Sequence, residues 1–237
     1  MKQKFSCLLL FASCLLLILS FSACGGDDDS SGVPGLNLTP YVITGSGTSF
    51  TAKHNGSTVE TANQPIAIVI GYIKSVAAGA DCHIQLGNGT DPLDITSGSI
   101  EFNDTGWGTI TLSGKATSSS EISVNNSNTV HSIADITHNS SGHAFRIDNG
   151  TLSIYSGTFT STGLAIGNYG GGTLTIYSGT FTGAHSDGTI FNGGTATIYS
   201  GTITGSPAIY NIASQASFRA RNSVTINGSI VGDITRF

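Results

Sequence analysis

Three tyrosines recur along the chain at a constant separation, with hydroxyl-bearing residues beside them. Tyr155, Tyr177 and Tyr199 follow one another at intervals of 22 residues, and Thr175 and Thr197 each lie two positions before a tyrosine. A phenol combines an apolar ring with a polar tip, a mixture that enriches tyrosine in binding surfaces. A planar row of such rings flanked by hydroxyls suits the apolar face and the hydroxyl rim of a sugar chain. These five residues are the predicted ligand-binding set; the alternative is that their stacking only stabilises the strands that carry them.

Acid–base catalysis on such a ligand would need carboxylates held together, and the sequence gives no sign of them. Asp135, Asp148 and Asp187 are isolated, and Asp148 and Asp187 lie 39 residues apart, which is not a whole number of 22-residue periods. Arg146 is close to Asp148 in sequence, which is typical of a local surface ion pair. No pair of carboxylates with the spacing of a glycosidase site can be argued. We therefore predict no catalytic residue and a protein that is not an enzyme.

Metal, cofactor and nucleic-acid sites are not predicted either. Cys82 alternates with polar residues as in a strand, which indicates a small buried side chain rather than a reactive thiol. The chain carries 14 acidic and 9 basic residues, which argues against the basic surface that nucleic acids require. The histidines of the repeated region are scattered, without the partners that would complete a metal site: His131, His138, His143 and His185.

A short repeated segment must position the tyrosines. The strings GTLSIYSGTFT, GTLTIYSGTFT and GTATIYSGTIT begin at residues 150, 172 and 194. In the second string Leu174, Ile176 and Phe181 alternate with polar residues, which is typical of strands with one buried face. The Ser-Gly pair between the two strands predicts a turn, because glycine adopts dihedral angles that other residues resist. A third short strand ending in asparagine follows at 165–168, 189–192 and 208–211.

One such unit cannot bury its own apolar face, but stacked units can, and a period of this length is typical of a solenoid. We predict an all-β fold, a right-handed single-stranded parallel β-helix of about seven turns with about 22 residues in each. Stacking in register would place like residues above one another, about 4.8 Å apart. The asparagines would form a ladder of side-chain amides at one corner and accept left-handed dihedral angles.

The segment 61–80 predicts a short helix that begins near Pro65. Ile66, Ile70, Ile73 and Val76 share one face at helical spacing; the alternative is a buried strand over residues 66–70, whose composition favours β-structure. The helix is followed by Ala-Gly-Ala-Asp, an alternating strand and a glycine turn. This order resembles the N-terminal cap of pectate-lyase-like β-helix proteins, which implies that the helix covers the open end of the core.

The first residues have the layout of a secretory signal, with Lys2 and Lys4 before an apolar run and small residues before Cys24. The string FSAC followed by GGDDDSSG resembles the bacterial lipoprotein signal, which implies cleavage after residue 23 and acylation of Cys24. The acidic residues after the cysteine resemble the surface-export signal of Bacteroidetes lipoproteins. The resemblance implies a lipid anchor in the outer membrane with the chain exposed at the cell surface; the alternatives are a periplasm-facing or a secreted protein.

These expectations divide the chain into a signal peptide (1–23), a flexible tether (24–40), a cap with irregular first turns (41–105) and the β-helix repeats (106–237). The predicted function is that of a non-catalytic surface lipoprotein, adhesin-like or glycan-binding. Its expected partners are the membrane, through acylated Cys24, and an extracellular polysaccharide or a host or cell-surface glycan. The alternatives are an enzyme resembling polysaccharide lyases or hydrolases, and a purely structural surface spacer.

Overall fold

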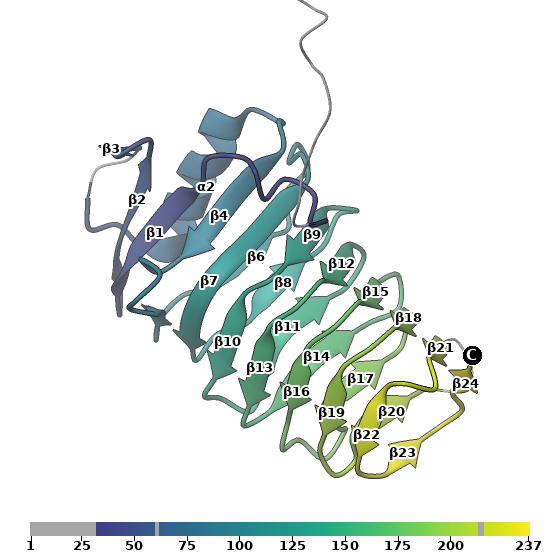
Figure 1. Ribbon diagram of the computed structural model, residues 1–237. Helices are drawn as coiled ribbons and strands as arrows, with labels where there is room; N and C mark the ends of the chain where they lie inside the picture. Colours follow the sequence, from purple (N-terminus) through teal and green to yellow (C-terminus); the bar gives the residue numbers. More distant parts are fainter. Residues whose placement is uncertain (1–31, 60–61, 213–215) are drawn as a thin grey trace, which may run out of the picture. The chain divides into compact units, whose positions relative to one another are not determined.

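The computed structural model describes residues 32–59, 62–212 and 216–237. Over these residues the chain is mostly β-structure and forms a parallel β-solenoid of about six turns, with a single short helix near the N-terminal end (Figure 1). The predicted parallel β-solenoid is therefore confirmed. The turns are one fewer than expected, because residues 41–58 form hairpin strands instead of a further turn.

Two sheets surround the core, and each regular turn contributes two strands to the longer sheet and one to the shorter. The shorter sheet, sheet B, consists of β6 (Ile100–Phe102), β8 (Ile122–Val124), β11 (His143–Ile147), β14 (Leu164–Asn168), β17 (Ile190–Asn192), β20 (Ile209–Asn211) and β23 (Ile230–Val231). The longer sheet, sheet A, consists of β1 (Tyr41–Ser46), β2 (Ser49–His54), β3 (Ser57–Thr58), β4 (Cys82–Leu86), β5 (Leu93–Ile95), β7 (Ile110–Ser118), β9 (Thr129–Ser132), β10 (Asp135–His138), β12 (Thr151–Ile154), β13 (Thr158–Ser161), β15 (Thr173–Ile176), β16 (Thr180–Thr182), β18 (Thr195–Ile198), β19 (Thr202–Thr204), β21 (Ser217–Ala220), β22 (Thr225–Asn227) and β24 (Thr235–Arg236).

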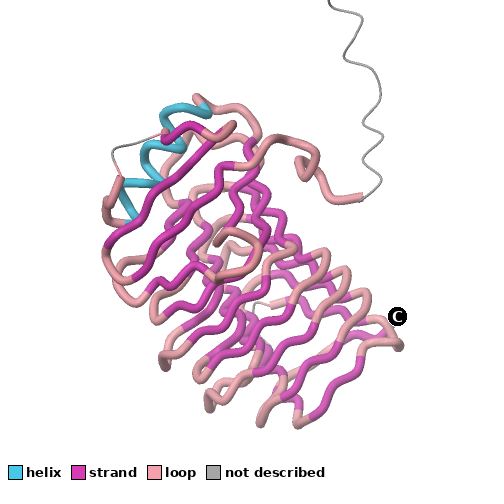
Figure 2. The backbone as a smooth tube through the Cα atoms, turned by 60° about the vertical axis from the view of Figure 1, so that its left-hand side comes forward, coloured by secondary structure: helices cyan, strands magenta, loops and turns pink. Residues whose placement is uncertain are grey.

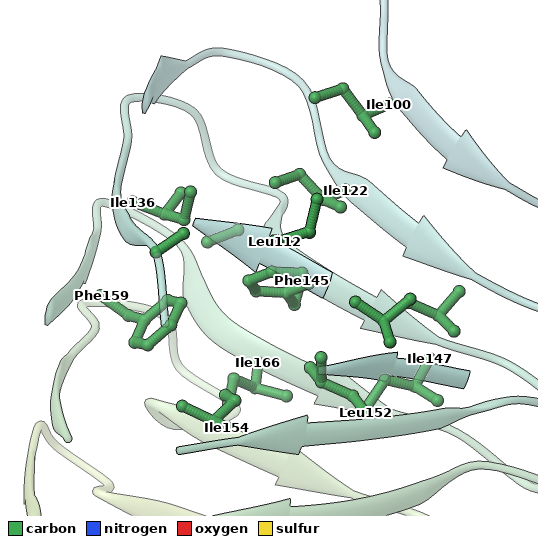
Figure 3. Close-up of a cluster of buried hydrophobic side chains, with 14 of the residues drawn as sticks. Ile100, Leu112, Ile122, Ile136, Phe145, Ile147, Leu152, Ile154, Phe159 and Ile166 are labelled. Carbon is green, nitrogen blue, oxygen red and sulfur yellow. The ribbon is translucent and has the colours of Figure 1, made fainter. Parts of the chain in front are cut away.

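Residues separated by 22 positions are superposed on consecutive turns. β12 pairs in parallel with β15, and β15 with β18, so that Ile154, Ile176 and Ile198 are aligned. The rings of Phe159 and Phe181 stack at 5.0 Å with planes 3° apart. These side chains are at most 1% exposed, and burying each contributes about 1.5–3 kcal/mol before the entropy of ordering is subtracted. Figure 3 shows such side chains directed into the interior between the strands.

A glycine bends the chain between the two sheet-A strands of each regular turn. Gly179, between β15 and β16, has a φ of 143°, a value that side-chain-bearing residues rarely adopt. A Cβ at Gly157 or Gly201 would also lie 2.3 or 2.5 Å from a carbonyl oxygen of the preceding turn. The repeated Ser-Gly pair therefore provides both the bend and the close approach of one turn to the next, as predicted.

A ladder of buried asparagines runs along sheet B. The Nδ2 group of Asn168 donates to Oδ1 of Asn192 at 2.7 Å, and Nδ2 of Asn192 donates to Oδ1 of Asn211 at 2.7 Å. All three side chains are at most 3% exposed. The predicted amide ladder is confirmed, but the expected left-handed dihedral angles are wrong, because these residues lie at strand ends with negative φ.

The helix α2 (Ile66–Ala77) begins after Pro65 and packs against β2 and β6 at one end of the stack (Figure 2). Its buried residues belong to the same core as the strands: Ile66, Val69, Ile70 and Ile73. The predicted helix is therefore confirmed, and the alternative buried strand is wrong. Val76 was expected on the packed face but is 51% exposed, because it lies in the last turn of α2, beyond Ile73, the last buried residue of the helix.

An antiparallel hairpin accompanies the helix at this end. β1 pairs antiparallel with β2, and β2 with β3, while β1 pairs in parallel with β4. This hairpin was not predicted from the sequence. Together with α2 it completes the N-terminal end of the solenoid, where a bare strand edge would otherwise be available for pairing.

Candidate functional site

The outward side of sheet A carries only hydroxyl-bearing residues over the three clean repeats. They lie on β12, β13, β15, β16, β18 and β19 and at the strand ends, in register from turn to turn. We call this surface the hydroxyl face; it consists of Thr151, Ser153, Tyr155, Thr158, Thr160, Thr173, Thr175, Tyr177, Thr180, Thr182, Thr195, Thr197, Tyr199, Thr202 and Thr204. Hydroxyls therefore repeat at about 4.8 Å between turns and at about 6.7 Å along each strand.

The tyrosines of the hydroxyl face stack as predicted. The ring centroids of Tyr155 and Tyr177 are 4.6 Å apart with planes 20° from parallel, and those of Tyr177 and Tyr199 are 5.4 Å apart with planes 7° from parallel. Burial, followed by the charge of Tyr177, raises the pKa of Tyr155 above its ordinary value. The phenol of Tyr155 therefore remains protonated and uncharged at neutral pH.

The orientation of these rings differs from the expected planar row. Nearly parallel rings at these distances overlap, so that each covers part of the face of the next. The row therefore presents ring edges and phenol hydroxyls, with Tyr177 42% exposed. This surface consequently favours hydrogen bonds from the tyrosine hydroxyls and the adjacent threonines over the stacking of sugars on open ring faces.

Two structural boundaries limit the hydroxyl face at its N-terminal side. His131 lies beside Tyr155, with ring centroids 5.5 Å apart, and burial lowers the pKa of His131. Beyond it, residues 33–38 lie across β4 and β7: Thr111 Oγ1 donates to the carbonyl of Pro34 at 2.6 Å, and Nδ1 of His83 is 3.1 Å from the carbonyl oxygen of Leu38. Residues 33–38, assigned from composition to the tether, thus belong to the folded unit.

Cations and an aromatic ring limit the hydroxyl face at its C-terminal side. The guanidinium of Arg221 lies 5.0 Å from the ring centroid of Tyr199, and that of Arg219 lies 4.8 Å from the centroid of Phe237. The rings of Tyr199 and Phe237 meet edge to face at 6.0 Å. The uncharged surface therefore ends where these arginines begin.

Sheet B brings together a second set of polar residues, whose grouping was not predicted from the sequence. His143 Nδ1 lies 3.2 Å from Glu121 Oε2, and His143 Nε2 lies 2.6 Å from the hydroxyl of Tyr169. Arg146 donates from Nε to both carboxylate oxygens of Asp148 at 3.0 Å, which confirms the predicted local ion pair. We call Glu121, His143 and Tyr169 the Glu-His-Tyr row.

Burial is the main influence on the pKa values of His143 and Tyr169. It lowers the pKa of His143, although the Glu121 carboxylate acts in the opposite direction. Burial also raises the pKa of Tyr169, which Arg146 partly offsets. A neutral imidazole that donates from one nitrogen to Glu121 can accept the Tyr169 proton at the other, the arrangement that general-base catalysis uses.

The remaining predictions concern the cysteines, metal ligation and the membrane. Cys82 is 2% exposed, and burial, followed by the charge of Asp81, raises the pKa of its thiol to about 12, in line with the predicted buried role. Across residues 32–59, 62–212 and 216–237, no three His, Cys, Asp or Glu side chains are grouped as metal ligands would be. Cys24 lies outside the described residues. No helix in the described part of the chain has the length and hydropathy needed to span a bilayer.

No model of a known protein family, no curated protein and no solved structure matches the chain. A parallel β-solenoid accommodates many unrelated functions, so the fold alone assigns none of them. The chemistry of the hydroxyl face and of the Glu-His-Tyr row is therefore the basis for assigning a function.

Proposed function

We propose that the chain is a non-catalytic glycan-binding protein of the bacterial cell surface, and that it binds an uncharged polysaccharide along the hydroxyl face. The observation that carries this proposal is the unbroken, uncharged array of Ser, Thr and Tyr hydroxyls, aligned on consecutive turns. Each hydroxyl can donate and accept a hydrogen bond, as can each hydroxyl of a sugar. The repeat of the array suits a ligand that is itself a repeating chain.

The rigidity of the array supports the same conclusion. Threonine has a stiff χ1 angle in a strand, and the tyrosine rings hold one another by stacking. Little side-chain entropy is therefore lost when a ligand binds, which is one of the main costs of association. Because the outward residues of the three clean repeats include no ionic group, no charge within the hydroxyl face has to be desolvated.

Attachment of this surface to the outer membrane through acylated Cys24 is part of the proposal. It is supported by the signal-like start of the sequence and by the acidic residues after Cys24. Replacing Cys24 by serine should abolish incorporation of a labelled fatty acid into the chain in cells. Protease treatment of intact cells then distinguishes a surface-exposed chain from a periplasm-facing or secreted one.

Binding itself is tested with a glycan array and the chain that begins at residue 25. We expect retention of uncharged polysaccharides and weaker retention by the double variant Thr175→Val, Thr197→Val, which keeps the side-chain shape but removes two hydroxyls. Thr58→Val, on the hairpin strand β3, is the matched control and should bind as the wild type does. Failure of the wild type to retain any polysaccharide would favour the structural spacer.

The Glu-His-Tyr row favours polysaccharide-directed acid–base chemistry as a second candidate. It would need Tyr169 to reach a proton of a bound sugar, with His143 as its proton acceptor. Release of reducing ends or of unsaturated sugars from a retained polysaccharide would support this candidate if Tyr169→Phe abolishes the release. Retention without any release would leave binding as the activity.

A further inference from the structure

A pocket of about 220 Å³ lies between helix α2 and sheet B at the capped end of the solenoid. Ile70, Gly71 and Lys74 line it from the helix, while Glu101 and Trp107 line it from β6 and the segment that follows. The hydroxyl face belongs to other turns, on strands β12 to β19 of sheet A. The pocket is therefore separate from the site described above and can be tested independently of it.

The apolar wall of the pocket includes the chain's single tryptophan. Trp107 is half-buried and meets the ring of Phe102 edge to face, with centroids 5.5 Å apart and planes 84° from parallel. This contact fixes the orientation of the indole. A fixed indole offers a broad apolar surface of the kind that covers the C–H face of a sugar ring.

Polar and charged groups line the rest of the pocket. Glu101 Oε2 accepts from Asn103 Nδ2 at 3.1 Å, and Asn103 Oδ1 accepts from the hydroxyl of Ser123 at 3.1 Å. Lys74 Nζ lies 3.1 Å from Asp104 Oδ2. Each carboxylate oxygen has a further acceptor position, so that neighbouring hydroxyls of one sugar ring can be bound from two directions.

The charges of the pocket favour an uncharged ligand. Glu101 and Asp104 exceed the single positive charge of Lys74, so a ligand with a carboxylate or sulfate would be repelled. The pocket is also smaller than the cavities that usually hold drug-sized molecules, which suits one ring rather than a chain. Both properties point to a single sugar residue, such as the free end of a glycan.

Gly71 gives a separate indication that the pocket is kept open. It lies inside α2, where glycine is less stable than alanine. Its φ is not in the left-handed region, and a Cβ added there would meet no other atom within 4 Å. Neither the backbone nor the packing therefore requires glycine, whereas a larger side chain would occupy space at the pocket.

From these observations we propose that the pocket binds one uncharged sugar ring, covered by Trp107 and hydrogen-bonded by Glu101 and by the Lys74–Asp104 pair. Small ligands of this size bind weakly, in the millimolar range. Because Trp107 is the only tryptophan, fluorescence of the full chain excited at wavelengths that tyrosine does not absorb reports on this pocket alone. The probes are the methyl glycosides of glucose, galactose, mannose and N-acetylglucosamine.

We expect at least one glycoside to shift the fluorescence in a saturable way, and Gly71→Phe to weaken that binding by about tenfold or more. Glu101→Gln, which leaves the pocket volume unchanged, should weaken the same binding. Ser75→Ala, elsewhere on α2, is the matched control and should bind normally. Gly71→Ala provides the check on folding, because it should raise the melting temperature while narrowing the pocket.

Two results would overturn this proposal. One is the absence of a saturable shift with every glycoside; the other is a shift that persists unchanged in both Gly71→Phe and Glu101→Gln. The two proposals are tested independently, because Tyr177→Phe changes the hydroxyl face and should leave the fluorescence response to glycosides unaltered. Loss of polysaccharide retention with an intact glycoside response, or the reverse, thus identifies which of the two sites exists.

Discussion

Replacing Tyr177 by phenylalanine removes one hydroxyl from the hydroxyl face and preserves the ring stack. The ring keeps its neighbours Tyr155 and Tyr199 at 4.6 and 5.4 Å. Because Tyr177 is 42% exposed, we expect the free energy of unfolding to change by less than about 0.5 kcal/mol. The same substitution removes one hydrogen bond to a bound polysaccharide, a net loss of about 0.5–1.5 kcal/mol.

That loss corresponds to a dissociation constant about two- to thirteenfold higher. Alanine at the same position behaves differently, because it also removes two aromatic pairs worth about 0.5–1.5 kcal/mol each. Tyr177→Ala should therefore lower the melting temperature as well as the affinity, and only the phenylalanine variant separates binding from stability.

The assay is calorimetric titration of the purified chain with the polysaccharide that the array selects, accompanied by urea unfolding of each variant. Tyr72→Phe is the matched control, since Tyr72 is 45% exposed on α2, away from the hydroxyl face. An unchanged affinity in Tyr177→Phe, together with a lower stability in Tyr177→Ala, would show that the tyrosine row is only a scaffold.

Three further predictions concern the body of the solenoid. Asn192→Ala removes two ladder bonds and leaves Oδ1 of Asn211 without its buried donor, so the free energy of unfolding in urea should fall by about 3–5 kcal/mol. Asn168→Ala should lower the free energy of unfolding by less, because Oδ1 of Asn168 already lacks a partner. An equal or larger decrease in Asn168→Ala would contradict this reasoning. The Cys82 thiol should resist iodoacetamide in the folded chain, because it is buried and its pKa is raised to about 12. Mass spectrometry should detect alkylation of Cys82 only after urea is added. Burial lowers the pKa values of His83, His131, His138 and His143 below the ordinary 6.5; the unfolded chain therefore binds more protons below that pH, and the urea midpoint should fall as the pH drops from about 7.5 to about 5.5. A midpoint that rises over this interval would refute the assignment of neutral buried imidazoles.

The repeat made much of the fold predictable, because parallel stacking turns a separation of 22 residues into spatial contact. The tyrosine row and the asparagine ladder follow directly from this relation. The orientation of the tyrosine rings did not, since it depends on side-chain dihedral angles that the spacing leaves open.

The Glu-His-Tyr row shows where the repeat stops being informative. Glu121 and His143 are 22 residues apart, so this contact was available from the sequence. Tyr169, however, is not in their column and reaches His143 across Gly167, where a Cβ would lie 2.4 Å from His143 Cδ2 and 2.8 Å from Tyr169 Cε2. A missing side chain thus creates the space for the contact, and no periodic pattern indicates it.

The N-terminal end was the least predictable part. The hairpin β1–β2 and the pocket beside α2 arise from segments that do not repeat, so their contacts are set by the way unlike elements meet. The helix itself was predictable because Ile66, Ile70 and Ile73 follow helical spacing, whereas Val76 follows the same spacing and nevertheless faces the solvent.

Because the three clean repeats are equivalent, the hydroxyl face can be lengthened by adding further repeats. Duplication of one 22-residue unit would lengthen the stack by about 4.8 Å and add a further tyrosine, without altering any existing contact except at the junction. Each added unit would give a long polymer one more point of attachment, and avidity would increase through the high local concentration of neighbouring points. The number of repeat units alone would thus set the affinity for a polymer, while the chemistry of each turn stays unchanged.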